Sequence, residues 1–214
     1  MHPINITLYN SFKRYSSLNA SVVLYEINIR YVYKKIFDEA LQKYNAKQKR
    51  KDRIILDYYK HICSSKQQEP YCELVIQLGE KCTNSKTVVE LGKKILVEYS
   101  NIFIQQYNKS TNIYVVGMYL GYNDNVPRLY IKYVPVAHNF KTGLETRVSK
   151  NKALIEMGYS HYSNEQQKVI GDYVMFRKKI ADELEQISIK YNITLNKPYS
   201  NMLTNNVVNS MYNL

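Results

Sequence analysis

The sequence predicts a mixed α/β domain of the α+β kind, in which an antiparallel sheet has flanking helices. Short β-branched stretches alternate with longer stretches whose apolar residues recur at helical spacing. Two apolar stretches, 113–121 and 127–135, are separated only by the turn sequence Asn-Asp-Asn-Val-Pro. This short connection predicts two adjacent antiparallel strands, and we expect the helices to pack on one face of the sheet.

The first third of the chain is predicted to contain one strand and two helical stretches. Residues 20–27 are apolar and β-branched, which is typical of a strand. From Arg30 onward, Val32, Ile36 and Ala40 fall on one face of a helix that runs into the basic segment 43–53. A second helical stretch is expected around residues 55–62.

The middle of the chain is predicted to add a strand and a long amphipathic helix. Residues 71–79 alternate between apolar and polar, with Cys72, Leu74 and Ile76 on one face. Residues 87–107 have Val88, Leu91 and the apolar residues that follow them at helical spacing.

Two further helices and a tail are expected toward the C-terminus. A short helix over 149–157 should end before Gly158, and a long helix should run from about 164 to about 191. The segment 198–214 is rich in Asn and weakly patterned, so we expect one domain over 1–197 and a loose tail after it.

Charge and cysteine content indicate the surroundings of the protein. The 214 residues carry a formal net charge of +12, which favours a polyanionic partner such as nucleic acid. Three scattered cysteines without a Cys-x-x-Cys pair favour a reduced, cytoplasmic location. The chain begins without an apolar signal segment and lacks any run of about 20 apolar residues, so no membrane partner is expected.

Three stretches resemble the plasmid mobilisation and recombination relaxases of the Mob/Pre (MobV) family. They are FDEALQKYNAKQKRKDRIILDYYKHI at 37–62, LYIKYVPVAHNFKTGLETRVSKNKAL at 129–154 and the segment after 165. The resemblance implies a palm-like antiparallel sheet with flanking helices, as in HUH endonucleases. It also implies an ancestral activity, the nicking of one DNA strand with the help of a divalent metal held by histidines.

The family motif His-x-Asp-Glu-x-x-Pro-His-Leu-His is degenerate in this chain. When the motif is aligned on Pro127, its first histidine falls on Gly121 and its acidic pair on Asn123 and Asp124. Its last two histidines fall on Arg128 and Tyr130. Glycine has no side-chain ligand and a guanidinium repels cations, so we expect neither a metal nor another cofactor here.

The nucleophile of the family is also missing from its expected place. The chain begins close to the segment RYSSLN at 14–19, and His2 lacks the Asn-x-Arg pattern that follows the nucleophile in the family. A tyrosine is an alternative nucleophile, although the sequence singles none of them out.

The replaced residues and two basic segments are candidate DNA contacts. Arg128, Tyr130 and Lys132 share one strand face, where the guanidinium suits phosphate and the ring suits an unpaired base. The alternative is a groove that its own tyrosine side chains fill. The basic segment contributes Lys43, Lys47, Lys49, Arg50, Lys51 and Arg53, and the loop after the strand contributes Lys141 and Arg147.

Three functions stay open at the level of sequence. The first is a DNA-binding relaxase homologue without nicking activity, acting alone or beside an active relaxase. The second is a divergent nicking enzyme with a relocated nucleophile, which a cluster of two or more carboxylates facing the groove would favour. The third is a scaffold that binds another protein.

Overall fold

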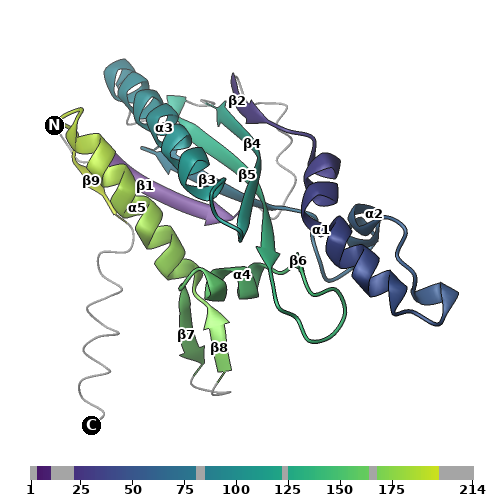
Figure 1. Cartoon of the computed structure of the whole chain (residues 1–214). Coiled ribbons are helices and arrows are strands. Elements are labelled where there is room, and N and C mark those ends of the chain that lie inside the picture. The colour runs from purple at the N-terminus through teal and green to yellow at the C-terminus, as the bar shows by residue number, and fades with distance from the viewer. Residues whose placement is uncertain (1–3, 11–21, 81–84, 122–124, 164–167, 198–214) are drawn as a thin grey trace, which may run out of the picture.

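The computed structural model describes residues 4–10, 22–80, 85–121, 125–163 and 168–197 (Figure 1). Its centre is a seven-stranded sheet in which the strands lie in the order β2-β4-β5-β3-β1-β9, while β6 pairs with β5. The strands are β1 Ile4–Asn10, β2 Val22–Glu26, β3 Cys72–Leu78, β4 Ile113–Gly121, β5 Arg128–Ala137, β6 Arg147–Val148 and β9 Leu195–Asn196. All of these pairings are antiparallel except that of β1 with β9, so the predicted α+β class is confirmed.

The helices are α1 Ile29–Ala46, the short 3-10 helix η2 Lys51–Arg53, α2 Tyr58–Cys63, α3 Lys86–Tyr107, α4 Lys150–Glu156 and α5 Tyr173–Ile189. Four of these helices, α1, α2, α3 and α5, are preceded by a residue whose side chain caps them. The side chains of Asn28, Asp57 and Ser85 accept hydrogen bonds from backbone N–H groups in the first turns of α1, α2 and α3. Gly158 follows α4 with a φ of 85°, which confirms the predicted end of that helix.

The predicted hairpin between β4 and β5 is confirmed. The two strands are antiparallel neighbours in the middle of the sheet, and Gly121 at the end of β4 pairs with Arg128 at the start of β5. A β-bulge between Val115 and Gly117 shifts the register within β4. Since β5 pairs on its other side with β3, the strand of the degenerate motif lies at the centre of the sheet.

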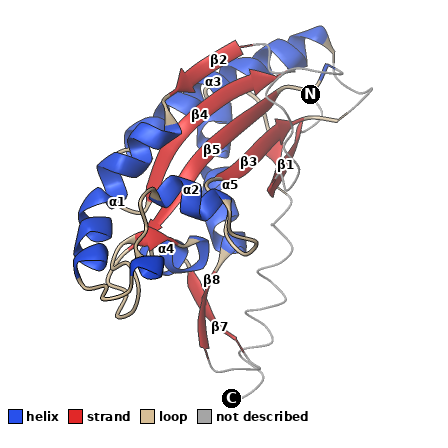
Figure 2. Ribbon diagram, turned by 90° about the vertical axis from the view of Figure 1, so that its right-hand side faces the viewer, coloured by secondary structure: helices blue, strands red, loops and turns tan. Residues whose placement is uncertain are grey.

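One face of the sheet packs against α3 and α5. Leu129, Ile131 and Tyr133 of β5 are buried on this face with aromatic residues of α3, including Tyr99 and Phe103. In Figure 2, which is turned by 90° from Figure 1, α3 and α5 lie behind the strands. The burial of so many large apolar side chains makes this layer the main core.

The expectation that all helices pack on one face was wrong. A second core lies on the other face, where Val134 and Val136 of β5 contact α1 and α2 through Phe37 and Ile62. These two valines alternate with the residues of the main core, so the end of β5 is covered on both sides. On this face of β5, Arg128, Tyr130 and Lys132 precede the two valines and do not belong to the second core.

The long helix predicted from 164 to 191 is present as α5, Tyr173–Ile189, but its predicted start was wrong. Residues Ser160–Ser163 (β7) and Lys168–Gly171 (β8) form a two-stranded hairpin, and α5 begins only at Tyr173. Asp172 caps α5, because its Oδ1 accepts hydrogen bonds from the N–H groups of Val174 and Met175 at 2.8 and 3.0 Å. The apolar residues at 169 and 170 fitted the helical spacing but belong to a strand.

The sequence analysis also missed the strands at the two ends of the described chain. β1 pairs with β3, and its residues Ile4 and Asn5 pair in parallel with Leu195 and Asn196 of β9. This pairing joins the first and last described residues in one sheet. The predicted tail at 198–214 lies outside the described residues.

Candidate nucleic-acid interface

The central strand presents its motif residues on the face opposite the main core. Arg128, Tyr130 and Lys132 are half-buried, whereas Leu129 and Ile131 between them are fully buried against the helices. The strand period of two therefore aligns the three side chains as predicted. Their neighbours on β3 and β4 share the same face because cross-strand partners do so in an antiparallel sheet.

The positions aligned with the three motif histidines lie together at one end of this face. Gly121 and Arg128 are direct cross-strand partners, and Tyr130 pairs with Tyr119 on β4. Asn123 and Asp124 lie outside the described residues.

Gln77 orients the side chain of Arg128. Gln77 is the cross-strand partner of Arg128 on β3, and its Oε1 accepts a hydrogen bond from Nε of Arg128 at 2.9 Å. Such a bond restricts the plane of the guanidinium, whose terminal nitrogens form the fork that matches a phosphate. The candidate phosphate contact is therefore held by a partner that the sequence analysis did not name.

Lys132 is surrounded by aromatic rings and faces a carboxylate. Its Nζ lies 5.0 Å from the ring centroid of Tyr119 and 5.7 Å from that of Tyr71. Its cross-strand partner on β3 is Glu73, which is only 8% exposed. Lys132 thus lies among aromatic rings, opposite a buried carboxylate.

Tyr119 is fixed in place rather than presented for stacking. Its hydroxyl donates a hydrogen bond to Oε1 of Glu26 at 3.0 Å, and the residue is only 6% exposed. Its ring crosses Gly117, where an added Cβ would lie 2.6 Å from the tyrosine hydroxyl. Burial is the larger cause and the hydrogen bond to Glu26 the next one, and together they raise the pKa of Tyr119 to about 12.

Two carboxylates, Glu26 and Glu73, therefore flank the ring of Tyr119 on the candidate face. The sequence analysis missed them, although the alternation of Cys72, Leu74 and Ile76 already placed Glu73 on the opposite side of β3. Lys132 stands across from Glu73 and offsets its charge, which disfavours a cation at that point. Throughout the described ranges, no group of three or more His, Cys, Asp or Glu side chains is arranged to hold a metal ion.

The basic segment lies at the opposite end of the sheet. β5 has ten residues, so Arg128 stands about 30 Å from the strand end that packs against α1 and α2. The segment 43–53 begins in the last turn of α1 and continues through η2, beyond that packing (Figure 1). The two predicted DNA contacts are therefore separate surfaces rather than one patch.

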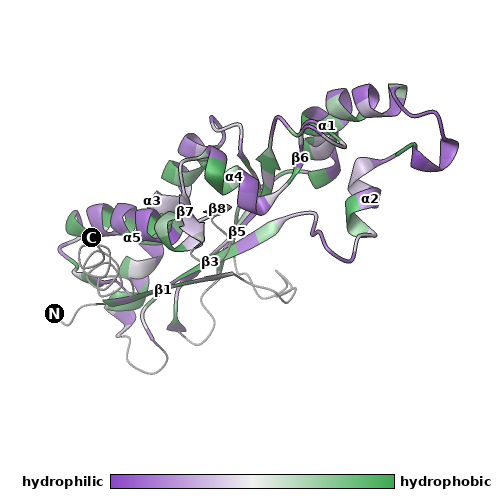
Figure 3. Cartoon of the chain, turned by 90° about the horizontal axis from the view of Figure 1, so that it is seen from below, coloured by the Kyte–Doolittle hydropathy of each residue, from purple (hydrophilic) through white to green (hydrophobic). Residues whose placement is uncertain are grey.

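The six cations of the basic segment differ in their contacts. Nζ of Lys43 lies 2.8 Å from Glu39 and 2.9 Å from Glu145, and a terminal nitrogen of Arg50 lies 2.7 Å from Asp52. The other four, Lys47, Lys49, Lys51 and Arg53, are exposed and form no ion pair within the described parts of the chain. Figure 3 shows this end of the molecule as strongly hydrophilic. If the segment contacts phosphates as predicted, these four cations are the candidates with exposed charges and no described carboxylate partner.

The loop after β5 is held in place by two cations that lie over the ring of Phe140. The guanidinium carbon of Arg147 lies 3.6 Å from the ring centroid of Phe140, and Nζ of Lys152 lies 3.8 Å from the same centroid. The bond between Lys43 and Glu145 connects this loop to α1. Lys141 is exposed on the loop, so it extends the basic segment, whereas Arg147 has a structural contact.

The described histidines contact neighbouring side chains. Nδ1 of His138 lies 3.1 Å from Glu156, and Nδ1 of His161 lies 2.9 Å from Asp172. The ring of His61 stacks on Tyr58 with a centroid distance of 6.3 Å. These contacts give the three histidines structural partners.

Comparisons with known proteins leave the resemblance as a hypothesis. The chain matches no family model, no curated protein and no solved structure. Within the described ranges, no helix is both long and apolar enough to cross a membrane.

Proposed function

We propose that this protein binds DNA and has a relaxase-like sheet whose metal-binding positions are replaced. The observation that carries the proposal is the position of Arg128. It stands opposite Gly121 on the central strands, is oriented by Gln77 and is followed on the same face by Tyr130. A guanidinium and an aromatic ring two residues apart suit a phosphate and an adjacent base.

A second surface supports the same function. Lys47, Lys49, Lys51 and Arg53 are exposed at the far end of the molecule, and Lys141 lies on the loop connected to α1. Lysines of this kind contribute a salt-dependent affinity that is independent of base sequence. We therefore assign general phosphate contacts to these exposed cations and single-strand contacts to the face with Arg128.

A divergent nicking enzyme is the second candidate, because Glu26 and Glu73 flank the hydroxyl of Tyr119. Three features weigh against it. The pKa of Tyr119 is raised, so its hydroxyl stays protonated and is a poor nucleophile at neutral pH. Lys132 is the cross-strand partner of Glu73 and adds a positive charge to this face, and Arg128 stands at a position where the family has a metal ligand.

The function is tested by fluorescence anisotropy with labelled single- and double-stranded oligonucleotides at several salt concentrations. DNA binding that weakens with salt supports the proposal. A covalent protein–DNA adduct on a denaturing gel would favour the enzyme, and the absence of any DNA binding would favour a protein-binding scaffold.

A further inference from the structure

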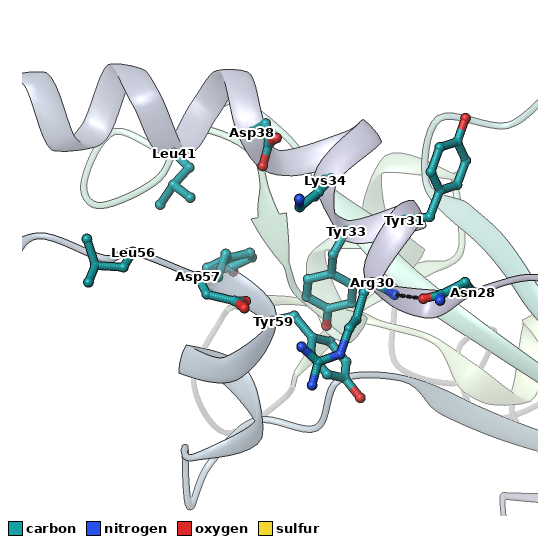
Figure 4. Close-up of a pocket in the computed structure, with 11 residues that line it drawn as sticks. Asn28, Arg30, Tyr31, Tyr33, Lys34, Asp38, Leu41, Leu56, Asp57 and Tyr59 are labelled. Atoms are coloured by element: carbon teal, nitrogen blue, oxygen red, sulfur yellow. Dashed lines mark hydrogen bonds between the residues drawn. The ribbon is translucent and has the colours of Figure 1, made fainter.

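A cleft between α1 and α2 lies apart from the candidate face (Figure 4). Its volume is about 550 Å³, which is enough for a nucleobase with its sugar but far too little for a duplex. The helices that form it begin at Asn28 and Asp57, and both of these capping residues line it.

The floor of the cleft is a set of tyrosine rings held by the fold. The ring of Tyr33 lies 5.1 Å from that of Tyr59 and 5.9 Å from that of Tyr58. The Tyr33 hydroxyl donates to the carbonyl of Pro70 at 2.7 Å, and the Tyr58 hydroxyl accepts from N–H of Val148 at 3.2 Å. Tyr33 and Tyr58 are only 2% and 6% exposed, so they act as a fixed support, and the ring that the cleft presents is that of the half-buried Tyr59.

The mouth of the cleft combines a cation over a ring with an exposed leucine. The guanidinium carbon of Arg30 lies 5.2 Å from the ring centroid of Tyr59. Leu56 is 93% exposed, so its apolar side chain makes little contact within the protein. Figure 4 shows Leu41 and Leu56 at one end of the cleft and the carboxylate of Asp57 turned toward its centre.

The segment that forms the cleft carries much of the charge of the chain. Residues 28–63 contain ten Lys and Arg but four Asp and Glu, a net charge of +6 compared with +12 for all 214 residues. Such a surface attracts a polyanion, while an exposed leucine beside aromatic rings favours an apolar, planar group. A nucleic acid strand with unpaired bases has both properties.

We propose that the cleft between α1 and α2 binds an unpaired base of single-stranded DNA. The base stacks against Tyr59 and Arg30 and contacts Leu56, while Lys34 contacts the backbone phosphate. This inference rests on the proposed DNA-binding function and adds a site distinct from Arg128.

The carboxylates of the cleft predict which bases it prefers. Asp57 uses Oδ1 to accept the N–H of Lys60, and Asp38 adds a second carboxylate to the lining. Carboxylate oxygens accept hydrogen bonds from exocyclic amino groups, which cytosine has and thymine lacks. The site should therefore prefer cytosine to thymine.

Three variants of the full-length protein test the site with labelled oligo-dC, oligo-dT and duplex DNA. Leu56→Ser should weaken binding of oligo-dC about fivefold with an unchanged salt slope, because it removes a base contact and no charge. Asp57→Asn keeps a good helix cap but alters the acceptors, so it should abolish the preference for oligo-dC. Ile189→Ser is the matched control, because it replaces an apolar side chain that is 59% exposed at the end of α5. It should change neither the affinity for oligo-dC nor the salt slope.

A crosslinking experiment on the parent protein makes the test independent of folding. Oligo-dC carrying 5-iodocytosine is irradiated with the protein, and the crosslinked peptide is identified by mass spectrometry. A crosslink to Tyr59 or Tyr31 supports the site, and crosslinks confined to peptides outside residues 28–63 overturn it.

The outcomes separate this inference from the function on which it rests. If the parent binds no DNA, both fail. If the parent instead binds DNA without preferring oligo-dC to oligo-dT, the cleft is not a base site, while the proposed function stands. The same conclusion follows if Leu56→Ser binds like the parent.

Discussion

Nε of Arg128 donates a hydrogen bond to Oε1 of Gln77 at 2.9 Å, across the pair formed by β5 and β3. This bond joins a residue of the degenerate motif to a strand that carries no part of the motif. It sets the orientation of the charged group that replaces a metal ligand in our proposal. The bond therefore predicts that the two residues act together in binding DNA.

The first prediction concerns that pair. Gln77→Leu should weaken binding of single-stranded DNA by roughly the 1–3 kcal/mol of a lost charge-assisted hydrogen bond, although the charge of Arg128 remains. In a double-mutant cycle with Arg128→Ala, the second substitution should add little to the first. Gln105→Leu, at an exposed residue of α3, is the matched control. Fully additive effects of Gln77→Leu and Arg128→Ala would contradict the prediction.

The second prediction separates paired from unpaired cations in the basic segment. Changing Lys47, Lys49 and Lys51 together to Ala should flatten the salt slope on duplex DNA by up to about 2.7 units, at about 0.9 per lost phosphate contact. As a control, Lys86, Lys94 and Lys109, in α3 and just after it, are changed together to Ala. This variant loses the same total charge but should change the salt slope much less. Equal effects of the two triple variants would indicate that only net charge matters.

The third prediction concerns the stability of the protein at high pH. The pKa of Tyr119 is about 12 in the folded chain, whereas an unfolded tyrosine releases its proton at about pH 10. The unfolded state therefore loses this proton first as the pH rises. The stabilising contribution is complete below about pH 10 and is lost toward about pH 12, with a magnitude on the order of 2 kcal/mol.

Urea denaturation of Tyr119→Phe between pH 7 and pH 11.5 tests this. At pH 7 the variant should be less stable by about 1 kcal/mol, because it lacks the bond to Glu26. Above about pH 10 the difference should shrink and then reverse. Tyr162→Phe, at a residue that is 74% exposed, is the control. If the difference in the free energy of unfolding between Tyr119→Phe and the parent did not depend on pH, the raised pKa of Tyr119 would be refuted.

The fourth prediction concerns metal and nicking. Mn²⁺ or a chelator should change the melting temperature by less than about 1 °C, and supercoiled plasmid should not be nicked with or without Mn²⁺. The reason is that, in the alignment on Pro127 that our proposal uses, Gly121, Arg128 and Tyr130 replace the three motif histidines. Stoichiometric metal that is lost in Glu73→Gln, or a covalent adduct to a tyrosine, would instead support the enzyme hypothesis.

The sequence predicted the parts of the fold that depend on local pattern. The hairpin of β4 and β5 followed from its turn, and the face of Arg128, Tyr130 and Lys132 followed from strand alternation. The start predicted for the last helix was wrong because Val169 and Ile170 fit both a helical spacing and a short strand. Only the cap at Asp172 separates the hairpin from α5.

Pairings between distant segments were the part that the sequence could not predict. β1 and β9 are short, and they meet only because the fold brings the two ends of the described chain together. For the same reason, the contacts of Gln77 with Arg128 and of Glu26 with Tyr119 were missed. Each joins two residues that are more than fifty positions apart in the sequence.

The most direct test of the proposed function is the affinity of the full-length protein for a labelled single-stranded oligonucleotide at about 50, 100 and 200 mM salt, measured by fluorescence anisotropy beside Arg128→Ala. We expect micromolar or tighter binding that weakens steadily with salt, and a variant whose binding is weaker by about 1–3 kcal/mol. The absence of binding at about 100 mM salt, or equal binding by the variant and the parent, would contradict the role assigned to Arg128.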